Sequence, residues 1–161
     1  MERPRACKTI EELRVGERIE KKYSISDEDI KSFANISEDF NPIHFDENYA
    51  NGTIFGRRIA HGMISLSKFS GIFGMDMPGL GTLWVSQYVH FHKPVFIGEP
   101  YTAVAEIISI DRRRVTIATW VEDAQGTRVL SGEGTVIPIS DKTKKSLSDT
   151  NSASFRPANI G

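Results

Sequence analysis

The chain has 161 residues, of which 39% are hydrophobic and 25% are charged, and its formal net charge is −1. This balance is typical of one soluble globular domain and excludes a disordered chain or a strongly basic surface that would attract nucleic acid or anionic membranes. Its single cysteine, Cys7, cannot form a disulfide within the chain, which favours a reducing compartment, so we expect a cytoplasmic protein.

The first part of the chain predicts a loose arm, a short strand and a capped helix. Residues 1–9 are expected to form the arm, and residues 18–25 form a strand with weak alternation. Ser26-Asp27-Glu28-Asp29 has the form of a capping box, so a helix should begin there. The residues expected on its buried side are spaced at helical intervals: Ile30, Phe33, Ala34 and Ile36.

Two further helices are expected next. The first helix must end before Asn41-Pro42, because the residue before a proline is pushed out of the α region. A short helix should then cover residues 46–50. Residues 62–75 carry one charge in fourteen positions, and Ser and Gly fill their polar positions. A helix that is apolar or small nearly all round is buried on most sides, so this segment predicts a central buried helix. No apolar stretch approaches the ~20 residues of a membrane span.

After Pro78-Gly79-Leu80-Gly81 the pattern changes to β-strands separated by hairpin turns. Four strands are expected over residues 82–91, 101–110, 114–122 and 128–139. Four long strands after one buried helix indicate an α+β fold in which an antiparallel sheet wraps around that helix. We therefore expect one domain over residues 10–140, followed by a mobile polar tail over residues 141–161.

The segment Ser37-Glu38-Asp39-Phe40-Asn41-Pro42-Ile43-His44 contains the main candidates for chemistry. The Asp39 carboxylate and the His44 imidazole stand five residues apart across a loop that the proline stiffens, so both side chains can be directed at one spot. Asn41 can hydrogen-bond the local backbone and hold the turn. An Asx-type turn in which His44 is merely packed is the alternative on residue types alone.

A second candidate segment, Arg58-Ile59-Ala60-His61-Gly62-Met63, comes directly before the expected buried helix. Gly62 at a helix start exposes backbone N–H groups, and the helix dipole adds positive potential there. Such a place can stabilise a developing oxyanion. A glycine that serves only tight packing is the alternative.

Taken together, residues 37–44 and His61-Gly62-Met63 resemble the (R)-specific enoyl-CoA hydratases, in the MaoC-like branch of the hotdog fold. The resemblance covers residues 10–139, and one departure is Glu38, where many relatives have Gly. It continues through three further segments: Phe69-Ser70-Gly71, Pro78-Gly79-Leu80-Gly81 and Pro94-Val95-Phe96-Ile97-Gly98-Glu99.

The resemblance implies that Asp39 and His44 hold and activate a water molecule, and that the Gly62 N–H polarises the carbonyl of an enoyl-CoA thioester. It also implies that Ser70 lines the active site and that Phe73 faces an acyl tunnel. We expect Ser70 and Phe73, together with Asn41, on the substrate-binding side, and the bulk of Phe73 suggests a short acyl chain. Relatives of this kind are usually homodimers, which would cover the edge strands of the sheet.

The implied chemistry explains these groups. Hydration needs a water at Cβ of the enoyl thioester, a base for its proton, a donor to the carbonyl oxygen and a proton for Cα. Asp39 and His44 can share one water and transfer the protons as a coupled pair, so which of them is formally the base stays open. No metal or organic cofactor is required, because the thioester is the electron sink. His90 and His92 share a strand face, but a zinc site needs a third ligand that we do not find beside them.

Other functions stay open. A thioesterase on this fold would carry a carboxylate on the central helix, and none occurs between Gly62 and Met75. A non-catalytic acyl-thioester-binding module would not need the Asp39–His44 pair. A dehydratase acting on acyl carrier protein is not separated from a CoA enzyme by the sequence. The sequence also does not distinguish between three pathways: polyhydroxyalkanoate precursor supply, β-oxidation and fatty-acid synthesis. Arg112-Arg113-Arg114 is expected to be a solvated turn, with contact to CoA phosphates as the alternative.

Overall fold

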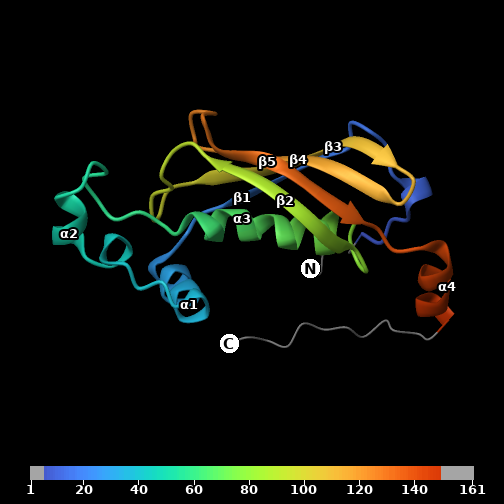
Figure 1. Ribbon diagram of the computed structural model, residues 1–161, viewed down its shortest axis with the longest axis horizontal. Coiled ribbons are helices and arrows are strands. Elements are labelled where there is room, and N and C mark those ends of the chain that lie inside the picture. The colour runs from blue at the N-terminus through green and yellow to red at the C-terminus, as the bar shows by residue number, and fades with distance from the viewer. Residues whose placement is uncertain (1–5, 150–161) are drawn as a thin grey trace.

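Five antiparallel strands form one sheet in the computed structural model, which describes residues 6–149 (Figure 1). The strand order is β1-β3-β4-β5-β2, so β1 and β2 are the two edges. The strands are β1 Arg18–Tyr23, β2 Leu83–Phe91, β3 Tyr101–Asp111, β4 Arg114–Glu122 and β5 Arg128–Ile137. Each strand lies where the sequence predicted it, with ends that differ by at most two residues.

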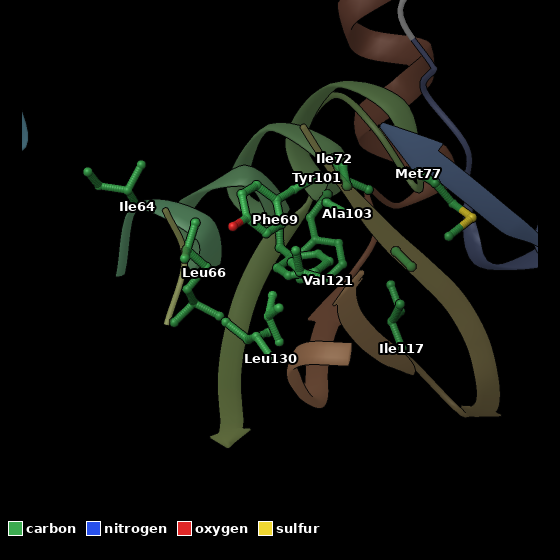
Figure 2. Close-up of a cluster of buried hydrophobic side chains, with 14 of the residues drawn as sticks. Ile64, Leu66, Phe69, Ile72, Met77, Tyr101, Ala103, Ile117, Val121 and Leu130 are labelled. Carbon is green, nitrogen blue, oxygen red and sulfur yellow. The ribbon is translucent and has the colours of Figure 1, made fainter. Parts of the chain in front are cut away.

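One helix, α3 (Gly62–Gly71), runs beneath this sheet (Figure 1). Its buried side chains Ile64, Leu66 and Phe69 join the hydrophobic core. Figure 2 shows them gathered with inward-facing strand residues such as Tyr101 and Val121. A buried helix covered by one antiparallel sheet is the architecture expected from the sequence, and burial of each large apolar side chain contributes about 1.5–3 kcal/mol.

The C-terminal part of the predicted buried helix differs from expectation. Residues 62–71 are α-helical, but the chain then widens into a π-helical turn, η3 (Ile72–Asp76). Ile72 and Phe73 are buried within that turn. Pro78 lies just beyond the turn and lacks an N–H, as expected for a segment that stops a helix.

Helix α1 (Asp27–Ser37) begins with the predicted capping box. The Ser26 side chain accepts from the Asp29 N–H, and the Asp29 carboxylate accepts from the Ser26 N–H. Ile30 and Ala34 are buried as predicted, but Ile36 is 82% exposed, so its place in the buried stripe was wrong. At 3.6 residues per turn Ile36 lies about 200° around the helix from Ala34, on the opposite side.

Two short helical segments follow α1 toward the same end of the molecule (Figure 1). They are η2 (Pro42–His44) and α2 (Glu47–Asn51). The Asp46 side chain caps α2 by accepting from the Tyr49 N–H. These segments hold the loop that contains the predicted Asp39–His44 pair.

The two ends of the described chain are more ordered than the sequence suggested. Residues 6–8 do not form a loose arm, because the Ala6 N–H donates to Met75 and the Lys8 N–H to Pro78. They lead into a short 3-10 helix, η1 (Ile10–Glu12). Lys144 in turn donates to Glu12 over 2.6 Å.

The predicted mobile tail starts as a helix, α4 (Asp141–Asp149). Ser140 begins it by accepting from the Thr143 N–H through its side chain and from the Lys144 N–H through its carbonyl. The expected arm over residues 1–5 and the tail beyond residue 149 lie outside the described residues. Within residues 6–149, the helices are all too short or too polar to cross a membrane.

Candidate active site

The loop between α1 and η2 holds Asp39 in a fixed turn. The Asp39 carboxylate accepts from the Asn41 N–H at 3.1 Å, and the Asn41 side chain accepts from the Ile43 N–H at 3.2 Å. Asn41 therefore performs the local backbone role that the sequence suggested. The Asx-type turns are present, and Oδ2 of the Asp39 carboxylate lies 3.8 Å from Nε2 of both His44 and His61.

The His44 ring is oriented by one backbone carbonyl. Its Nδ1–H donates to the Ile59 oxygen at 2.8 Å, so Nε2 of the neutral ring carries no proton. That nitrogen lies 3.8 Å from Oδ2 of Asp39, whose side chain is half exposed. The distance is too long for a direct hydrogen bond. The pair therefore presents a carboxylate oxygen and an unprotonated imidazole nitrogen side by side.

The environment of His44 favours its neutral form. Burial lowers the pKa of this imidazole, the Ile59 hydrogen bond opposes that effect, His61 lowers the pKa further and Asp39 raises it. The net direction is downward, and the side chain is only 9% exposed. A neutral ring with a free nitrogen is the form that a general base requires.

His61 is a member of this site that the sequence interpretation did not assign. Its ring stacks on His44 with centroids 3.7 Å apart, and its Nε2–H donates to the backbone oxygen of Asp39 at 2.9 Å. The residue is 3% exposed, and its Nδ1 has no hydrogen-bond partner among residues 6–149. Its place directly before Gly62, in a segment already singled out, was the available signal.

A metal would find ligand types here but poor geometry. Potential ligand atoms of Asp39, His44 and His61 all lie within 4.8 Å of one another. The two rings, however, are stacked with planes 28° apart, so their in-plane lone pairs run side by side instead of converging on one ion. The Nε2 of His61 is also occupied by the Asp39 carbonyl. This arrangement suits proton transfer through His44 better than metal binding.

Gly62 begins α3 next to this site, so its N–H has no partner within the helix. A Cβ at this position would lie 2.8 Å from Cε1 of Phe91, so a larger residue here would have to displace the Phe91 ring, which is 48% exposed. Gly62 lines a groove of about 450 Å³ whose other walls are mainly apolar, with Lys93 as the charged residue among them. The packing explanation for the glycine and its role as an oxyanion donor both stay predictions.

Ser70 and Phe73 lie apart from the groove beside Gly62. Ser70 is exposed on α3, eight residues from Gly62 and so about 12 Å along the helix axis. Phe73 is 2% exposed and packs edge-on against Trp84, with ring centroids 5.1 Å apart. It also lies close to Gly134, where an added Cβ would approach the Phe73 ring to 3.1 Å. The substrate-binding roles of both residues stay predictions.

Known proteins resemble this chain over most of its length. Residues 12–127 match the MaoC like domain family. An (R)-specific enoyl-CoA hydratase of Aeromonas caviae is 37% identical over 128 residues, which are 77% of this chain and 94% of that protein. A mitochondrial 3-hydroxyacyl-[acyl-carrier-protein] dehydratase of Arabidopsis thaliana is 34% identical over 150 residues, 89% of this chain and 88% of that protein. The solved structure of an unliganded R-hydratase from Pseudomonas aeruginosa has a TM-score of 0.78 and 35% identity, covering 83% of this chain and 86% of that one.

Proposed function

The chain belongs to the MaoC-like domain family, and on that basis we propose that it adds water reversibly to trans-2-enoyl-CoA to give (R)-3-hydroxyacyl-CoA. Its 37% identity to an (R)-specific enoyl-CoA hydratase supports an enzyme of this type. The observation that carries the proposal is the unprotonated Nε2 of buried His44 beside the Asp39 carboxylate, 3.8 Å away.

This spacing suits a shared water. An oxygen about 2.8 Å from both atoms would form hydrogen bonds about 85° apart, within the range that water accepts. One group of the pair takes a proton as the water oxygen bonds to Cβ, and the electron pair of the double bond moves onto the thioester carbonyl. A proton returned to Cα completes the addition, so the atoms balance without a cofactor. We assign the proton transfers to the pair as a whole, because both groups would contact the same water.

The enolate oxygen formed in this step needs a donor. We propose the Gly62 N–H, which begins α3 and has no helical partner. The adjoining apolar groove would hold the acyl-thioester, and low polarity there would strengthen the donor. On the substrate side, we propose that the Ser70 hydroxyl lines the active site and that the bulky Phe73 ring limits the length of the acyl chain. A kcat/KM for dodecenoyl-CoA above that for crotonyl-CoA would contradict the limit.

The first test is the loss of enoyl-thioester absorbance with crotonyl-CoA. We expect activity in the wild type and a fall of about 10²–10⁴-fold in both Asp39→Asn and His44→Gln, the range of general acid–base catalysis. Asp111→Asn at the exposed end of β3 is the matched control and should keep wild-type activity. Full activity in His44→Gln would refute the assignment of the pair. A folded wild type inactive on every enoyl thioester would refute the hydratase.

A second candidate keeps the chemistry and changes the carrier. The 150-residue match to an acyl-carrier-protein dehydratase, at 34% identity, favours it. The same acyl group offered on CoA and on acyl carrier protein separates the two, because only the carrier differs. A kcat/KM at least tenfold higher on acyl carrier protein would assign the dehydratase.

We also propose a homodimer. No strand of the described residues pairs with the outer side of the edge strand β2. This strand exposes large apolar side chains along its length: Leu83, Val85, Tyr88 and Phe91. Long apolar edge strands pair with other chains unless they are covered. A second copy of the same strand is the simplest cover, because a two-fold axis pairs one surface with itself. A cytoplasmic location remains our expectation.

A further inference from the structure

We propose that His61 is the positioning residue of this site. It holds Asp39 and His44 in a fixed position relative to the start of α3. The inference rests on the proposed function, since it assigns a role within that reaction, but its structural part can be tested without a substrate. His61 would not contact the reacting atoms. It would act through the two residues that do.

His61 touches both members of the pair. Its Nε2–H holds the backbone carbonyl of Asp39 at 2.9 Å, which fixes the loop from which that carboxylate projects. Its ring covers one face of the His44 ring, with centroids 3.7 Å apart. The Ile59 carbonyl already fixes His44 through Nδ1, so the ring is held both in its plane and from one face.

The same residue connects the pair to the proposed oxyanion donor. His61 is the N-cap of α3, and Gly62 follows it directly. Any shift of the Asp39 loop relative to α3 would break the His61 hydrogen bond or separate the stacked rings. One side chain therefore fixes the distance between the water-holding pair and the Gly62 N–H.

Packing alone does not account for a histidine here. The ring is 3% exposed, and Phe33 and Phe45 lie against it with centroids 5.1 and 6.3 Å away. Its Nδ1 is buried without a partner in the described part of the chain, which is unfavourable and which a phenylalanine of similar shape would avoid. The feature that phenylalanine cannot supply is the Nε2–H that holds Asp39.

Two substitutions separate the hydrogen bond from the ring. His61→Phe keeps an aromatic ring against His44 and removes the donor, whereas His61→Gln keeps an amide donor and removes the ring. We expect His61→Phe to lower kcat on crotonyl-CoA on the order of 10²-fold, with KM within about threefold, because misplaced groups lose the transition state rather than the substrate. His61→Gln should recover part of that loss. Gln125→Phe, in the exposed turn between β4 and β5, is the control and should match the wild type.

A second readout uses nuclear magnetic resonance of the histidine rings and needs no turnover. The titratable groups that act on His44 are Asp39 and His61, and His61 lowers the His44 pKa. In His61→Phe the titration midpoint of His44 should therefore rise, and the amide signals of residues 39–41 should move. In the control Gln125→Phe neither should change.

The outcomes are distinct. Wild-type kcat in a folded His61→Phe would overturn the proposal. Equal losses of kcat in His61→Phe and His61→Gln that parallel the fall in their thermal unfolding midpoints would also overturn it, because that result assigns His61 a packing role. If the wild type hydrates no enoyl thioester, the proposed function fails and the resonance experiment still decides. If the titration midpoint of His44 and the amide signals of residues 39–41 are the same in His61→Phe as in the wild type, the positioning role is overturned.

Discussion

Glu38, next to the site, has a strained backbone conformation. It ends α1 with φ 60° and ψ 17°, the left-handed conformation that glycine adopts without cost. Its N–H still donates to Ala34 at 2.8 Å, so the helix end is satisfied although the residue type is unfavourable. A carboxylate at a helix C-terminus also opposes the helix dipole. Both effects destabilise the folded chain.

Replacing this residue should stabilise the protein. We expect Glu38→Gly to raise the free energy of unfolding by about 1 kcal/mol, because it removes the left-handed strain and the charge together. Urea unfolding measures the difference, and Glu38→Gln serves as the control because it removes the charge and keeps the strain. Equal gains in the two variants would show that charge alone is responsible. An unchanged midpoint in Glu38→Gly would contradict the strain argument.

The depressed pKa of His44 predicts how stability depends on pH. The unfolded ring titrates near 6.5, and burial lowers the pKa in the folded chain, so the unfolded state binds more protons below that value. Stability is therefore unaffected by this group above pH 6.5 and falls as the pH drops from 6.5 toward the folded pKa. Urea unfolding between pH 5 and 8 should show this loss in the wild type and less of it in His44→Gln. Parallel curves would contradict it, since the other histidines are common to both proteins.

At the scale of elements, periodicity and capping explain most of what could be predicted. The strands and the buried helix were found because the alternation of side chains and a charge-poor stretch depend on local spacing. The prediction for Ile36 was wrong, because its angle around α1 already placed it on the exposed side of the helix. The π-turn at η3 and the helix α4 were not predicted. The contacts beside them, such as Lys144 with Glu12, join residues far apart in the chain.

In the candidate site too, local motifs could be predicted from the sequence, whereas contacts between distant segments could not. Asp39, His44 and Asn41 belong to one short motif, so their proximity was predictable from the sequence. His61 lies in a separate segment, and only the fold brings its ring onto His44 and its Nε2–H onto Asp39. Ser70 and Phe73 came from the resemblance alone, and they lie on α3 and on the π-turn η3, away from the groove at Gly62.

At the scale of the whole molecule, the two edges of the sheet differ in what covers them. The edge strand β1 alternates exposed charged residues with part-buried ones, for example Arg18, Glu20 and Lys22 on its exposed positions. Charged side chains of this kind discourage pairing with another chain. The opposite edge, β2, exposes Leu83 and Tyr88 to 64% and 67%. The asymmetry points to association through β2 and not through β1.

This asymmetry yields a test of assembly. We expect the wild type to elute with twice its chain mass of 18.0 kDa, and the double variant Leu83→Lys/Val85→Lys to elute as one chain. Lysines on a paired edge would face their own symmetry copies, so repulsion adds to the lost apolar area. Ile54→Lys, at a residue 96% exposed outside the sheet, is the control and should leave the mass unchanged. Light scattering coupled to gel filtration measures all three. A wild-type monomer, or a double variant that keeps the doubled mass, would assign the apolar edge another role and remove β2 from the proposed interface.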